Sequence, residues 1–576
     1  MADPEVVLAR LVSSALSDAL GAEYSGADPL IRPSQFADFQ ANAALSLARR
    51  LGRAPREVAA DVAAQLADSD VVEPPEVSGP GFINLTLRSE WIAAQATGLL
   101  GDPRLDVAPA NPLQKVVVDY SAPNVAKEMH VGHLRTTVVG DALVRVLEHL
   151  GDEVVRANHI GDWGTQFGKM VEHLLDIGEP AARQMLADGD INAFYEAATA
   201  SFDADPAFAE RARRRVVALQ AGDPETLRLW ELLVHSSEQY YNAIYARLGI
   251  TLTDADLAPE SFYNPMLAAV CDELEQAGLA VISDGALCAF PPGFTGRDGQ
   301  PLPLILRKSD GGYGYGTTDM AAIRYRTQEL KANRLLYVIG SEQSLHMNMV
   351  YAVAKQAGWL TPEISAEHVS IGLVTGADGK RFRSRSGGTV KLITLIDEAV
   401  ERASEVIADR YPDAAERARI AEAVGIGALK YGDLSVARDS SYALDFDRLL
   451  ALNGNTGPYL QYATARIRSI FLRAGLEPAD ARGPILVAEP AERTLALRLL
   501  GFGGAVHAVV PAAEPHKLAA YLFDVASTFT TFYEQCPVLR ADDEATRQSR
   551  LALSALTLRV LTTGLGLLGV PVPERM

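Results

Sequence analysis

Cysteine is scarce in this sequence: Cys271, Cys288 and Cys536 lie far apart and form no CxxC pair. A disulfide framework and a cysteine-rich zinc site are therefore not expected. The sequence also lacks an uninterrupted apolar run of about 18 residues, the length that a membrane-spanning helix requires. Its first residues lack the basic and then apolar pattern of a secretory signal. We therefore expect a soluble, cytoplasmic protein that does not act in a membrane.

Positive charge is also in deficit, since 53 Lys and Arg face 73 Asp and Glu, a formal net charge of −20. This balance excludes a broadly basic coat protein, although a local basic groove remains compatible with it. The 46 glycines and 31 prolines follow no period, which argues against a fibrous or disordered chain. A chain of 576 residues is too long for one hydrophobic core, so we expect about two to four domains.

Residues 1–108 have the pattern of a separate α+β module. Apolar residues recur at helical spacing between Leu8 and Leu20, and an amphipathic run extends from Leu45 to Leu66. The segment GPGFINLTL predicts a turn followed by a strand. The segment RLDVAPANPLQ, with two prolines, predicts a linker and therefore a domain boundary.

Residues 109–435 predict a Rossmann-like parallel sheet. The segment KVVVDYSAP, from Lys115, is a short apolar run typical of a strand buried on both faces. A helix from about His133 to Leu150 and a second strand, EVVRANHIGDWG, follow it. Such a strand–helix–strand unit indicates parallel strands. Matching strands stand at 334–340 and 368–374, and the residues between the two halves, about 170–300, look like an insertion.

After the sheet, residues 436–576 are helical almost to the end. Five or more apolar helical stretches joined by short loops predict an all-α bundle. The expected fold class is therefore α/β: a Rossmann-like parallel-sheet domain with an insertion, between an N-terminal α+β domain and a C-terminal all-α helical bundle.

The strongest chemical pattern is DYSAPNVAKEMHVGH, which runs from the carboxyl end of the first strand into a helix. Open α/β sheets bind ligands at that edge, and a helix N-terminus there favours phosphate oxygens. His130 and His133 flank Gly132, so both imidazoles can reach one phosphoryl group and donate hydrogen bonds to charge in a transition state. After the second strand, His159 and the turn GDWG could line the same pocket or form a tight turn beside a core tryptophan, and the pattern favours neither.

HVGH resembles the HIGH signature of the class I aminoacyl-tRNA synthetases. Its surroundings, SAPNVAKEMHVGHLRTTVVGDALVRVLEHLGDEVVRANHIGDWGTQFG, resemble the arginyl-tRNA synthetases in particular. Further segments resemble that family in the same order along the chain: DFQANAA, GPGFINLTL, GYGTTDMAAIRYR, GKRFRSRSGGTVKL, NTGPYLQYATARIRSI and PVPERM. The resemblance covers nearly the whole chain and implies an arginine–tRNA ligase. Such an enzyme activates arginine with ATP to arginyl-adenylate and transfers it to the 3′ end of tRNA(Arg).

The resemblance also implies partners and domain roles. The substrates would be L-arginine, ATP with Mg²⁺, and tRNA(Arg), without a DNA partner and without a dedicated protein metal site. The enzyme would be a monomer and would need bound tRNA before it activates arginine. Residues 1–108 would bind tRNA, residues 436–576 would bind the anticodon, and residues 376–390 would form the signature loop of the central catalytic domain.

By the same resemblance, five residues bind arginine: Asn124, Glu260, Tyr315, Asp319 and Gln343. Carboxylates hold a planar guanidinium best when they bind it in bidentate fashion. The matched positions place Glu260, Asp319 and Tyr315 at that group, and Asn124 and Gln343 nearer the amino and carboxylate end. Without the matched surroundings, an acid such as Glu260 would be interpreted as a solvated surface residue.

The resemblance implies nucleotide-binding and catalytic residues around these positions. ATP would contact His130, Gly132, His133, Gly340, His346 and Ser384, and the catalytic groups would be His130, His133, Lys127, Lys380 and Arg385. Considered alone, the cationic, glycine-rich segment KRFRSRSGG could close over a triphosphate or could simply be solvated. It departs from the family's KMSKS pattern, because no lysine stands at the second-lysine position. In many arginyl enzymes a lysine just before HIGH is considered to compensate, and Lys127 occupies that place.

Phe39, Gln40 and Asn42 are the candidates for a tRNA contact near the N-terminus. They offer one aromatic face and two amides, which can stack on and hydrogen-bond an unpaired base. In the family, this domain reads a base in the D-loop. Phe39 considered alone is more typical of a core residue.

Tyr459, Tyr462 and Arg466 are the candidates for an anticodon contact. They fall at i, i+3 and i+7 and so share one helix face. A stacking aromatic and an arginine suit anticodon bases, although Tyr462 could equally be a core residue. Because the overall charge opposes the polyanion, tRNA binding should weaken as salt rises.

Two other interpretations stay open. The HxGH pattern also occurs in other class I synthetases and in small-molecule nucleotidylyltransferases, although the N-terminal module and the helical C-terminal region disfavour a transferase. A catalytically inactive paralogue that only binds RNA is a further possibility, against which intact HVGH, Glu260 and Asp319 argue. ATP–pyrophosphate exchange with each amino acid, with and without tRNA, distinguishes these functions.

Overall fold

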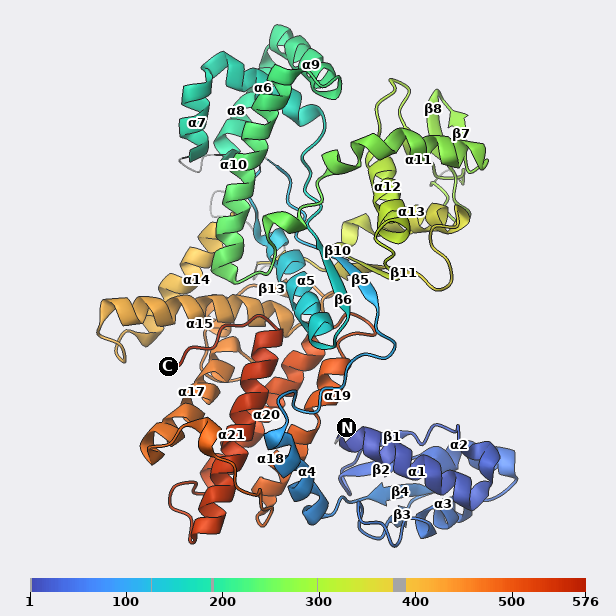
Figure 1. Cartoon of the computed structure of the whole chain (residues 1–576), viewed down its shortest axis with the longest axis vertical. Helices are drawn as coiled ribbons and strands as arrows, with labels where there is room; N and C mark the ends of the chain where they lie inside the picture. Colours follow the sequence, from blue (N-terminus) through green and yellow to red (C-terminus); the bar gives the residue numbers. More distant parts are fainter. Residues whose placement is uncertain (1–2, 126, 188–190, 298, 377–389) are drawn as a thin grey trace.

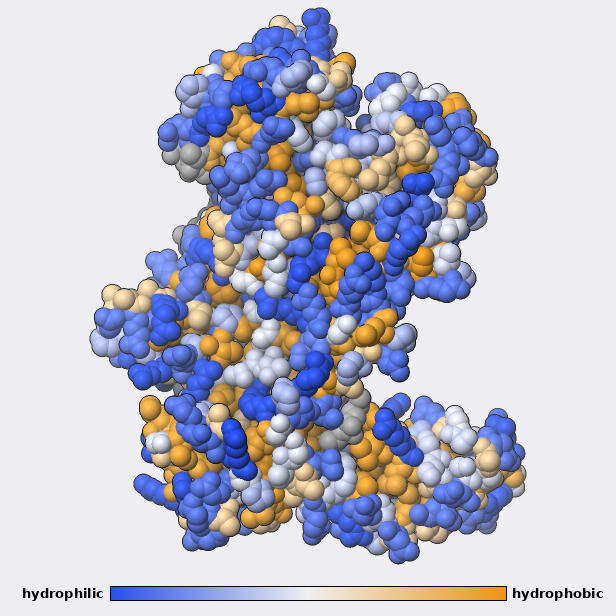
Figure 2. All heavy atoms as spheres, viewed as in Figure 1, coloured by the Kyte–Doolittle hydropathy of each residue, from blue (hydrophilic) through white to orange (hydrophobic). Residues whose placement is uncertain are grey.

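A computed structural model describes residues 3–125, 127–187, 191–297, 299–376 and 390–576 (Figure 1). Figure 1 shows the helices α6–α10 at one end of the molecule and the C-terminal helices at the other, with the N-terminal module beside them. In Figure 2, hydrophilic side chains cover most of the visible face, and a hollow separates the N-terminal module from the part that carries α11–α13.

The central sheet has the strand order β11-β10-β5-β6, and all its pairs are parallel. Its strands are β5 (Lys115–Asp119), β6 (Glu153–Ala157), β10 (Arg334–Gly340) and β11 (Ser365–Ile371). The sheet lies between two apolar layers. Val116 and Val118 pack on the side of α5 (Val131–His149), while Val117 faces α12 and α13 (Ser344–Gln356). Helices on both faces of a parallel sheet confirm the predicted Rossmann-like architecture.

The N-terminal module has a four-stranded antiparallel sheet in the order β1-β2-β4-β3. Its strands are β1 (Ile31–Pro33), β2 (Phe39–Ala41), β3 (Glu76–Ser78) and β4 (Phe82–Leu85). Its helices are α1 (Pro4–Leu20), η1 (Ala22–Tyr24), α2 (Ala43–Leu51) and α3 (Pro55–Ala64). The run predicted from Leu45 to Leu66 is therefore two helices, because Gly52 adopts a left-handed φ of 63° and ends the first of them.

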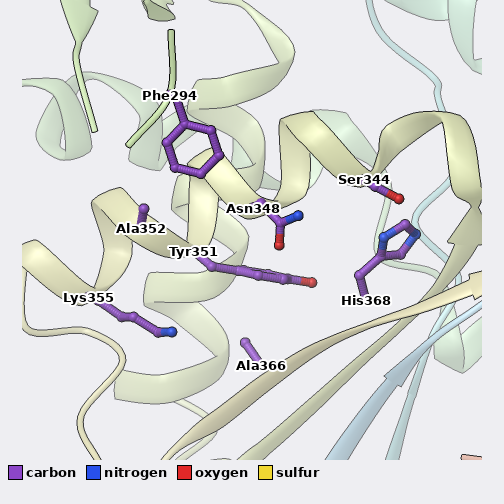
Figure 3. A pocket seen from close by; sticks show the side chains of 8 residues that line it. All are labelled: Phe294, Ser344, Asn348, Tyr351, Ala352, Lys355, Ala366 and His368. Carbon is purple, nitrogen blue, oxygen red and sulfur yellow. The ribbon is translucent and has the colours of Figure 1, made fainter. Parts of the chain in front are cut away.

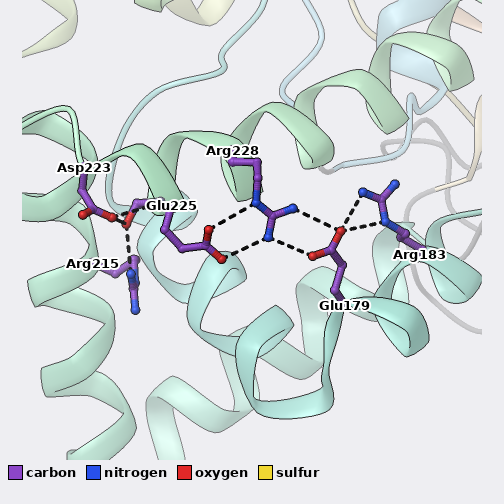
Figure 4. Close-up of polar contacts among 7 residues, drawn as sticks. Glu179, Arg183, Arg215, Asp223, Glu225 and Arg228 are labelled. Atoms are coloured by element: carbon purple, nitrogen blue, oxygen red, sulfur yellow. Dashed lines mark hydrogen bonds and ion pairs between the residues drawn. The ribbon is translucent and has the colours of Figure 1, made fainter.

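The segment between β6 and β10 contains two distinct parts. The first is helical: α6 (Thr165–Ile177), α7 (Glu179–Ala187), α8 (Ile191–Ala204), α9 (Pro206–Gln220) and α10 (Pro224–Leu248). We call α6–α10 the helical insertion. Figure 4 shows how charged side chains link its helices, with Arg228 of α10 between Glu225 and Glu179.

The second part lies beside the sheet and returns the chain to β10. It comprises η2 (Asp254–Asp256), η3 (Glu260–Tyr263), α11 (Asn264–Gln276), β7 (Ala280–Ser283), β8 (Ala286–Ala289), β9 (Leu304–Arg307) and α12 (Tyr315–Gln328). After β10 the chain forms η4 (Ser341–Gln343), α13, β11 and β12 (Val374–Thr375).

The chain from residue 390 onward is mainly helical, as expected for residues 436–576, but its first two helices precede that range. It contains α14 (Leu392–Ile407), α15 (Ala414–Leu434), β13 (Tyr442–Ala443), α16 (Phe446–Leu449), α17 (Gly457–Ala474), η5 (Pro478–Asp480), α18 (Pro490–Leu500), α19 (Phe502–His507), α20 (His516–Gln535) and α21 (Glu544–Leu567). Among the described residues, α21 is the one helix long and apolar enough to cross a membrane. Because 78% of its most apolar window is buried and it packs against α17 and α20, we assign it as a core helix of the bundle.

Ion pairs join these parts, among them Arg135–Asp433 and Arg493–Asp38. Arg135 of α5 and Asp433 of α15, both buried, lie 2.5 Å apart and connect the sheet to the C-terminal helices. Arg493 of α18 donates to both carboxylate oxygens of Asp38, at 2.8 and 2.7 Å, and so holds the β1–β2 hairpin against the bundle. The helix α4 (Ser89–Gly101) packs on α18 and α21, which further fixes the N-terminal module.

Candidate active site

The two histidines of HVGH lie at the first turn of α5, directly after the loop that leaves β5. His130 is the N-cap of α5, and its Nδ1 accepts a hydrogen bond from the backbone N–H of Gly132 at 3.0 Å. The Nδ1 of His133 accepts from the backbone N–H of His130, also at 3.0 Å. The two ring centroids are 4.0 Å apart. A Cβ at Gly132 would lie 2.8 Å from the His130 ring, so this close packing requires glycine.

These hydrogen bonds determine what the histidines present to a ligand. A ring nitrogen that accepts carries no proton, so the neutral form of each imidazole has its proton on Nε2. Burial, together with neighbouring His130, lowers the pKa of His133 to about 3, and this ring therefore stays neutral at physiological pH. The first turn of α5 thus presents Nε2–H donors beside the exposed backbone of Gly132.

Three carboxylates from separate elements lie near one another. Asp162 follows β6 and accepts two hydrogen bonds from Ser261, at 2.9 and 2.5 Å. Glu260 is brought beside it because its backbone N–H donates to the carbonyl of Ile160 at 3.1 Å. Asp319 stands one turn into α12. We call Asp162, Glu260 and Asp319 the acid cluster.

The acid cluster is poised for a cation. Burial and the charges of Asp162 and Asp319 raise the pKa of Glu260 to about 8. Burial also raises the pKa of Asp162 to about 6, against the lowering effect of Ser261. Carboxylates held close together disfavour one another's ionisation, and a bound cation would remove that repulsion. Tyr315, at the start of α12, is near enough that burial and the charge of Glu260 raise its pKa, although the side chain is 72% exposed.

His346 connects the acid cluster to the end of β10. Its Nε2 lies 2.6 Å from Oδ2 of Asp319, and this hydrogen bond raises the pKa of His346. His346 stands in the first turn of α13, shortly after Gly340, where β10 ends. The structure therefore places Asp319 and His346 in direct contact at the carboxyl edge of the sheet, a relation that the sequence pattern did not predict.

The remaining sequence-predicted residues of this edge lie around the same loops. Asn124 pairs with Gly161 through a short parallel bridge, and its carbonyl accepts from the Tyr241 hydroxyl at 2.5 Å. A Cβ at Gly161 would lie 2.5 Å from Oδ1 of Asn124, so the two loops approach this closely only at glycine. Gln343 is the exposed last residue of η4. The GDWG turn therefore brings Gly161 beside Asn124 and Asp162 beside Glu260, while Trp163 packs edge-on against Trp230 at 5.8 Å.

Of the cationic catalytic candidates, the structure describes only Lys127. Lys127 is exposed three residues before His130, and its Nζ lies 4.9 Å from the ring centroid of Tyr195. Lys380, Ser384 and Arg385 lie outside the described residues.

The described residues on either side of the predicted signature loop are nevertheless placed. Before it, β12 pairs with β13. After it, the backbone N–H of Val131 donates to Val390 and that of Leu392 donates to Met129, while Lys391 Nζ lies 2.9 Å from Glu128. The chain therefore returns from the loop directly alongside HVGH.

A cavity of about 560 Å³ lies apart from these residues, between α13 and the edge strand β11. Figure 3 shows Ser344 and His368 toward one end, Lys355 at another, and Phe294 across from α13. None of the sequence-predicted site residues that the structure describes lines it. The acid cluster and the HVGH turn, rather than this cavity, combine charge and hydrogen-bond donors at the carboxyl edge.

The N-terminal candidates lie on one hairpin but are only partly available. Phe39 is half-buried and packs against the core, and Gln40 donates to Oδ1 of Asn84 at 2.9 Å. Asn42 is the N-cap residue of α2. Phe36, in the turn before β2, is 83% exposed. Phe36 belongs to the same PSQFADFQ segment as Phe39, and no local sequence pattern distinguishes the exposed ring from the half-buried one.

On α17, only two of the three predicted residues are arranged for a ligand. Tyr459 bonds Thr530 of α20 at 3.2 Å and packs toward the bundle. The Arg466 guanidinium lies 5.5 Å from the Tyr462 ring and 5.1 Å from that of Tyr533. Tyr462 and Arg466 therefore form a joint cationic and aromatic surface.

Three family models match this chain. The model of the tRNA synthetases class I (R) catalytic domain matches residues 97–446. The DALR anticodon binding domain matches residues 460–576, and the arginyl tRNA synthetase N terminal domain matches residues 7–87.

Similar proteins agree with these models. An arginine–tRNA ligase from Thermobifida fusca is 63% identical, with all of both chains covered. Among solved structures, the arginyl-tRNA synthetase of Plasmodium falciparum has a TM-score of 0.84 and 29% identity and covers 100% of this chain and 99% of its own. That of Thermus thermophilus has a TM-score of 0.81 and 25% identity, with 100% of both chains covered.

Proposed function

Because the chain belongs to the arginyl-tRNA synthetases, we propose that arginine and ATP react where the acid cluster meets the first turn of α5. The chain is an arginine–tRNA ligase whose substrates are ATP, arginine and tRNA(Arg). The main support for this position of the arginine site is the raised pKa of Glu260, which arises from burial and the nearby Asp162 and Asp319. A cationic ligand is the group that such a cluster lacks.

For the arginine site, we propose that Glu260 and Asp319 bind the guanidinium. Its five N–H donors form a planar fork, so Glu260 can accept in bidentate fashion while Asp319 accepts through Oδ1, the oxygen that His346 leaves available. Tyr315 would cover the guanidinium from the start of α12, where its ring lies near Glu260. Asn124 and Gln343 would bind the amino and carboxylate end of arginine, nearer to β5 and β10.

For the nucleotide site, we propose that the phosphates lie at the first turn of α5. His130 and His133 would donate through Nε2–H, and Gly132 would leave its backbone open to a phosphate oxygen. Gly340 and His346, at the end of β10, would line the nucleotide. Ser384 of the signature loop would complete its contacts. Mg²⁺ would arrive with ATP, held by the phosphates, and we assign it no protein ligands.

The proposed chemistry follows from these positions. An oxygen of the arginine carboxylate attacks the α-phosphorus of ATP in line, the bond to the β-phosphate oxygen breaks, and arginyl-adenylate and pyrophosphate result. The carboxylate is already ionised at pH 7, so no general base is required. The histidine donors and the cations Lys127, Lys380 and Arg385 stabilise the charge on the phosphates and on the departing pyrophosphate. A terminal ribose hydroxyl of tRNA(Arg) then attacks the arginyl carbonyl carbon, and AMP leaves.

For tRNA, we propose two contact surfaces. On the N-terminal hairpin, Phe36 supplies the exposed stacking ring, and Phe39, Gln40 and Asn42 follow it in the same segment. On the bundle, Tyr462 and Arg466 face the anticodon, and Tyr459 supports α17 from behind. Tyrosine and arginine planes stack on unpaired bases without requiring a basic surface overall.

We further propose that the enzyme is a cytoplasmic monomer that acts on neither DNA nor membranes, and that it activates arginine only when tRNA(Arg) is bound. We place the domain boundaries at 108/109 and 435/436, with the catalytic domain between them, its insertion at about 170–300 and its signature loop at 376–390. The linker after α4, residues 102–114, supports the first boundary because it contains no helix or strand. The packing of α4 on the bundle gives the N-terminal domain its anchor.

ATP–pyrophosphate exchange tests this function. Each amino acid is supplied in turn, with and without tRNA(Arg), and radioactive pyrophosphate entering ATP is counted. The expected result is exchange only when arginine and tRNA(Arg) are both present. Exchange with another amino acid would contradict the specificity, and exchange with arginine in the absence of tRNA would contradict the proposed tRNA requirement.

A further inference from the structure

Tyrosines of the helical insertion contact the segment that leads into HVGH, among them Tyr241 and Tyr195. The hydroxyl of Tyr241, on α10, donates to the backbone carbonyl of Asn124 at 2.5 Å. The ring of Tyr195, on α8, lies under the Lys127 ammonium, with Nζ 4.9 Å from the ring centroid. The loop between β5 and α5 is therefore held from the side of the insertion as well as from the sheet.

Backbone hydrogen bonds hold Val125 and Lys127 in place. The Val125 N–H donates to Gly161 at 3.0 Å, and the Lys127 N–H donates to Asn124 at 3.2 Å. The Lys127 side chain itself is exposed, and among the described residues Tyr195 is the side-chain partner found for it. A free lysine samples many rotamers, so an aromatic face at its tip restricts where the ammonium lies.

Tyr195 is well placed to hold that position. Its neighbour Phe194 is fully buried in the core of the helical insertion and packs edge-on against His173 at 5.1 Å. Tyr195 is only half-buried, so its ring lies at the surface of this core. The network in Figure 4 braces the adjoining helices α7 and α10 through Glu179 and Arg228.

We propose that Tyr195 is a positioning residue for the activation step: it holds the Lys127 ammonium beside the phosphates bound at HVGH. This inference rests on the proposed function, in which Lys127 supplies the cation that the signature loop lacks. It also makes the helical insertion part of the catalytic apparatus, because a ligand such as tRNA that shifts α8 would also shift the Lys127 ammonium.

The test compares Tyr195→Leu, which removes the aromatic face, with Tyr195→Phe, which retains it. In arginine- and tRNA-dependent ATP–pyrophosphate exchange, we expect Tyr195→Leu to lower kcat about fivefold, with the KM for arginine unchanged and Tyr195→Phe near wild type. The matched control is Phe202→Leu, since Phe202 is a half-buried aromatic on the same helix that lies 4.2 Å from Lys169 Nζ. Its exchange rate should equal that of wild type.

A second comparison shows whether Tyr195 acts through the lysine. In a Lys127→Met background, Tyr195→Leu should cause no further loss, because the group that it positions is gone. Any one of four results would overturn the proposal. Tyr195→Leu could lower kcat equally in both backgrounds, or Tyr195→Phe could lower kcat as much as Tyr195→Leu does. Phe202→Leu could show a similar loss, or Tyr195→Leu could exchange faster than wild type. Failure of the wild type to exchange with arginine plus tRNA(Arg) would instead refute the proposed function itself.

Discussion

Oδ2 of Asp319 lies 2.6 Å from Nε2 of His346, so an acid on α12 and an imidazole on α13 share a proton at the carboxyl edge of the central sheet. The contact joins the arginine-facing side of the proposed site to its nucleotide-facing side. Oδ1 of Asp319 remains available for a guanidinium, while Oδ2 keeps His346 oriented toward the end of β10.

Replacing Asp319 by Asn should therefore affect both sides of the site. The loss of one charge-assisted partner, worth about 1.5–3 kcal/mol, should raise the KM for arginine about 10- to 100-fold. The pKa of His346 should fall, because its carboxylate partner is gone. Steady-state exchange kinetics and histidine NMR check the two effects. An Asp319→Asn enzyme with an unchanged KM for arginine would contradict the assignment.

Arginine binding should depend on pH through Glu260. Its pKa is about 8 in the free protein, so the carboxyl is mainly neutral at pH 7 and ionises as pH rises. Only the ionised form attracts a guanidinium, so affinity should rise with pH to about 8, and binding at pH 7 should release protons. Calorimetry at pH 7 in two buffers of different ionisation enthalpy measures that release. Glu260→Gln is the control, in which the release should shrink; equal heats in both buffers for the wild type would refute the prediction.

The histidines of HVGH should act without titrating in the physiological range. His133 keeps a pKa of about 3, so the kcat of exchange should show no inflection from this residue between pH 6 and 8. Removing its Nε2–H donor in His133→Ala should lower kcat about 10²- to 10³-fold, as expected for a donor aimed at transition-state charge. His133→Asn, which keeps an N–H donor on a shorter side chain, should lose less. A His133→Ala enzyme with wild-type kcat would exclude this role.

Phe36 should contribute more to tRNA binding than Phe39. Base stacking on an aromatic ring is worth about 1–3 kcal/mol, so Phe36→Ala should raise the KM for tRNA(Arg) about tenfold in aminoacylation while leaving the KM for arginine unchanged. Phe39→Leu is the comparison, because that ring is half-buried and packs against the core. The prediction fails if Phe39→Leu raises the KM for tRNA(Arg) and Phe36→Ala does not.

The buried Arg135–Asp433 pair should be essential for the stability of the sheet–bundle junction. Arg135→Met leaves the Asp433 carboxylate buried without its partner, which should cost about 3–5 kcal/mol and lower the Tm measurably. Arg547→Met breaks a more exposed pair with Glu544 on α21 and should change stability by less than about 1 kcal/mol. Thermal melts of the two variants, followed by circular dichroism, make the comparison; equal shifts would contradict it.

The central sheet was predictable because its signals are local. The valines after Lys115, the stretch RLLYVIG at 334–340 and the helix that starts at HVGH each carry their own hydrophobic pattern, and β10 has the predicted bounds. The break at Gly52 was missed, because the apolar pattern continues across it and only the left-handed backbone ends the helix.

Of the acid cluster, Glu260 and Asp319 were expected only through the family resemblance, and Asp162 was not among the residues expected to bind arginine. Glu260 reaches Asp162 because its backbone N–H donates to Ile160, a hundred residues earlier, and no periodicity in the sequence predicts such a contact. The same holds for the contact between Lys127, in the loop before α5, and Tyr195, in the helical insertion. Long-range packing brings these side chains together, so only the structure reveals the contacts.

A crystal structure with a non-hydrolysable arginyl-adenylate analogue tests the central claim most directly. The account predicts guanidinium nitrogens about 2.7–2.9 Å from carboxylate oxygens of Glu260 and Asp319, with a phosphate oxygen at the Nε2 atoms of His130 and His133. An analogue bound elsewhere, for example in the cavity between α13 and β11, with both acids left in solvent, would contradict it.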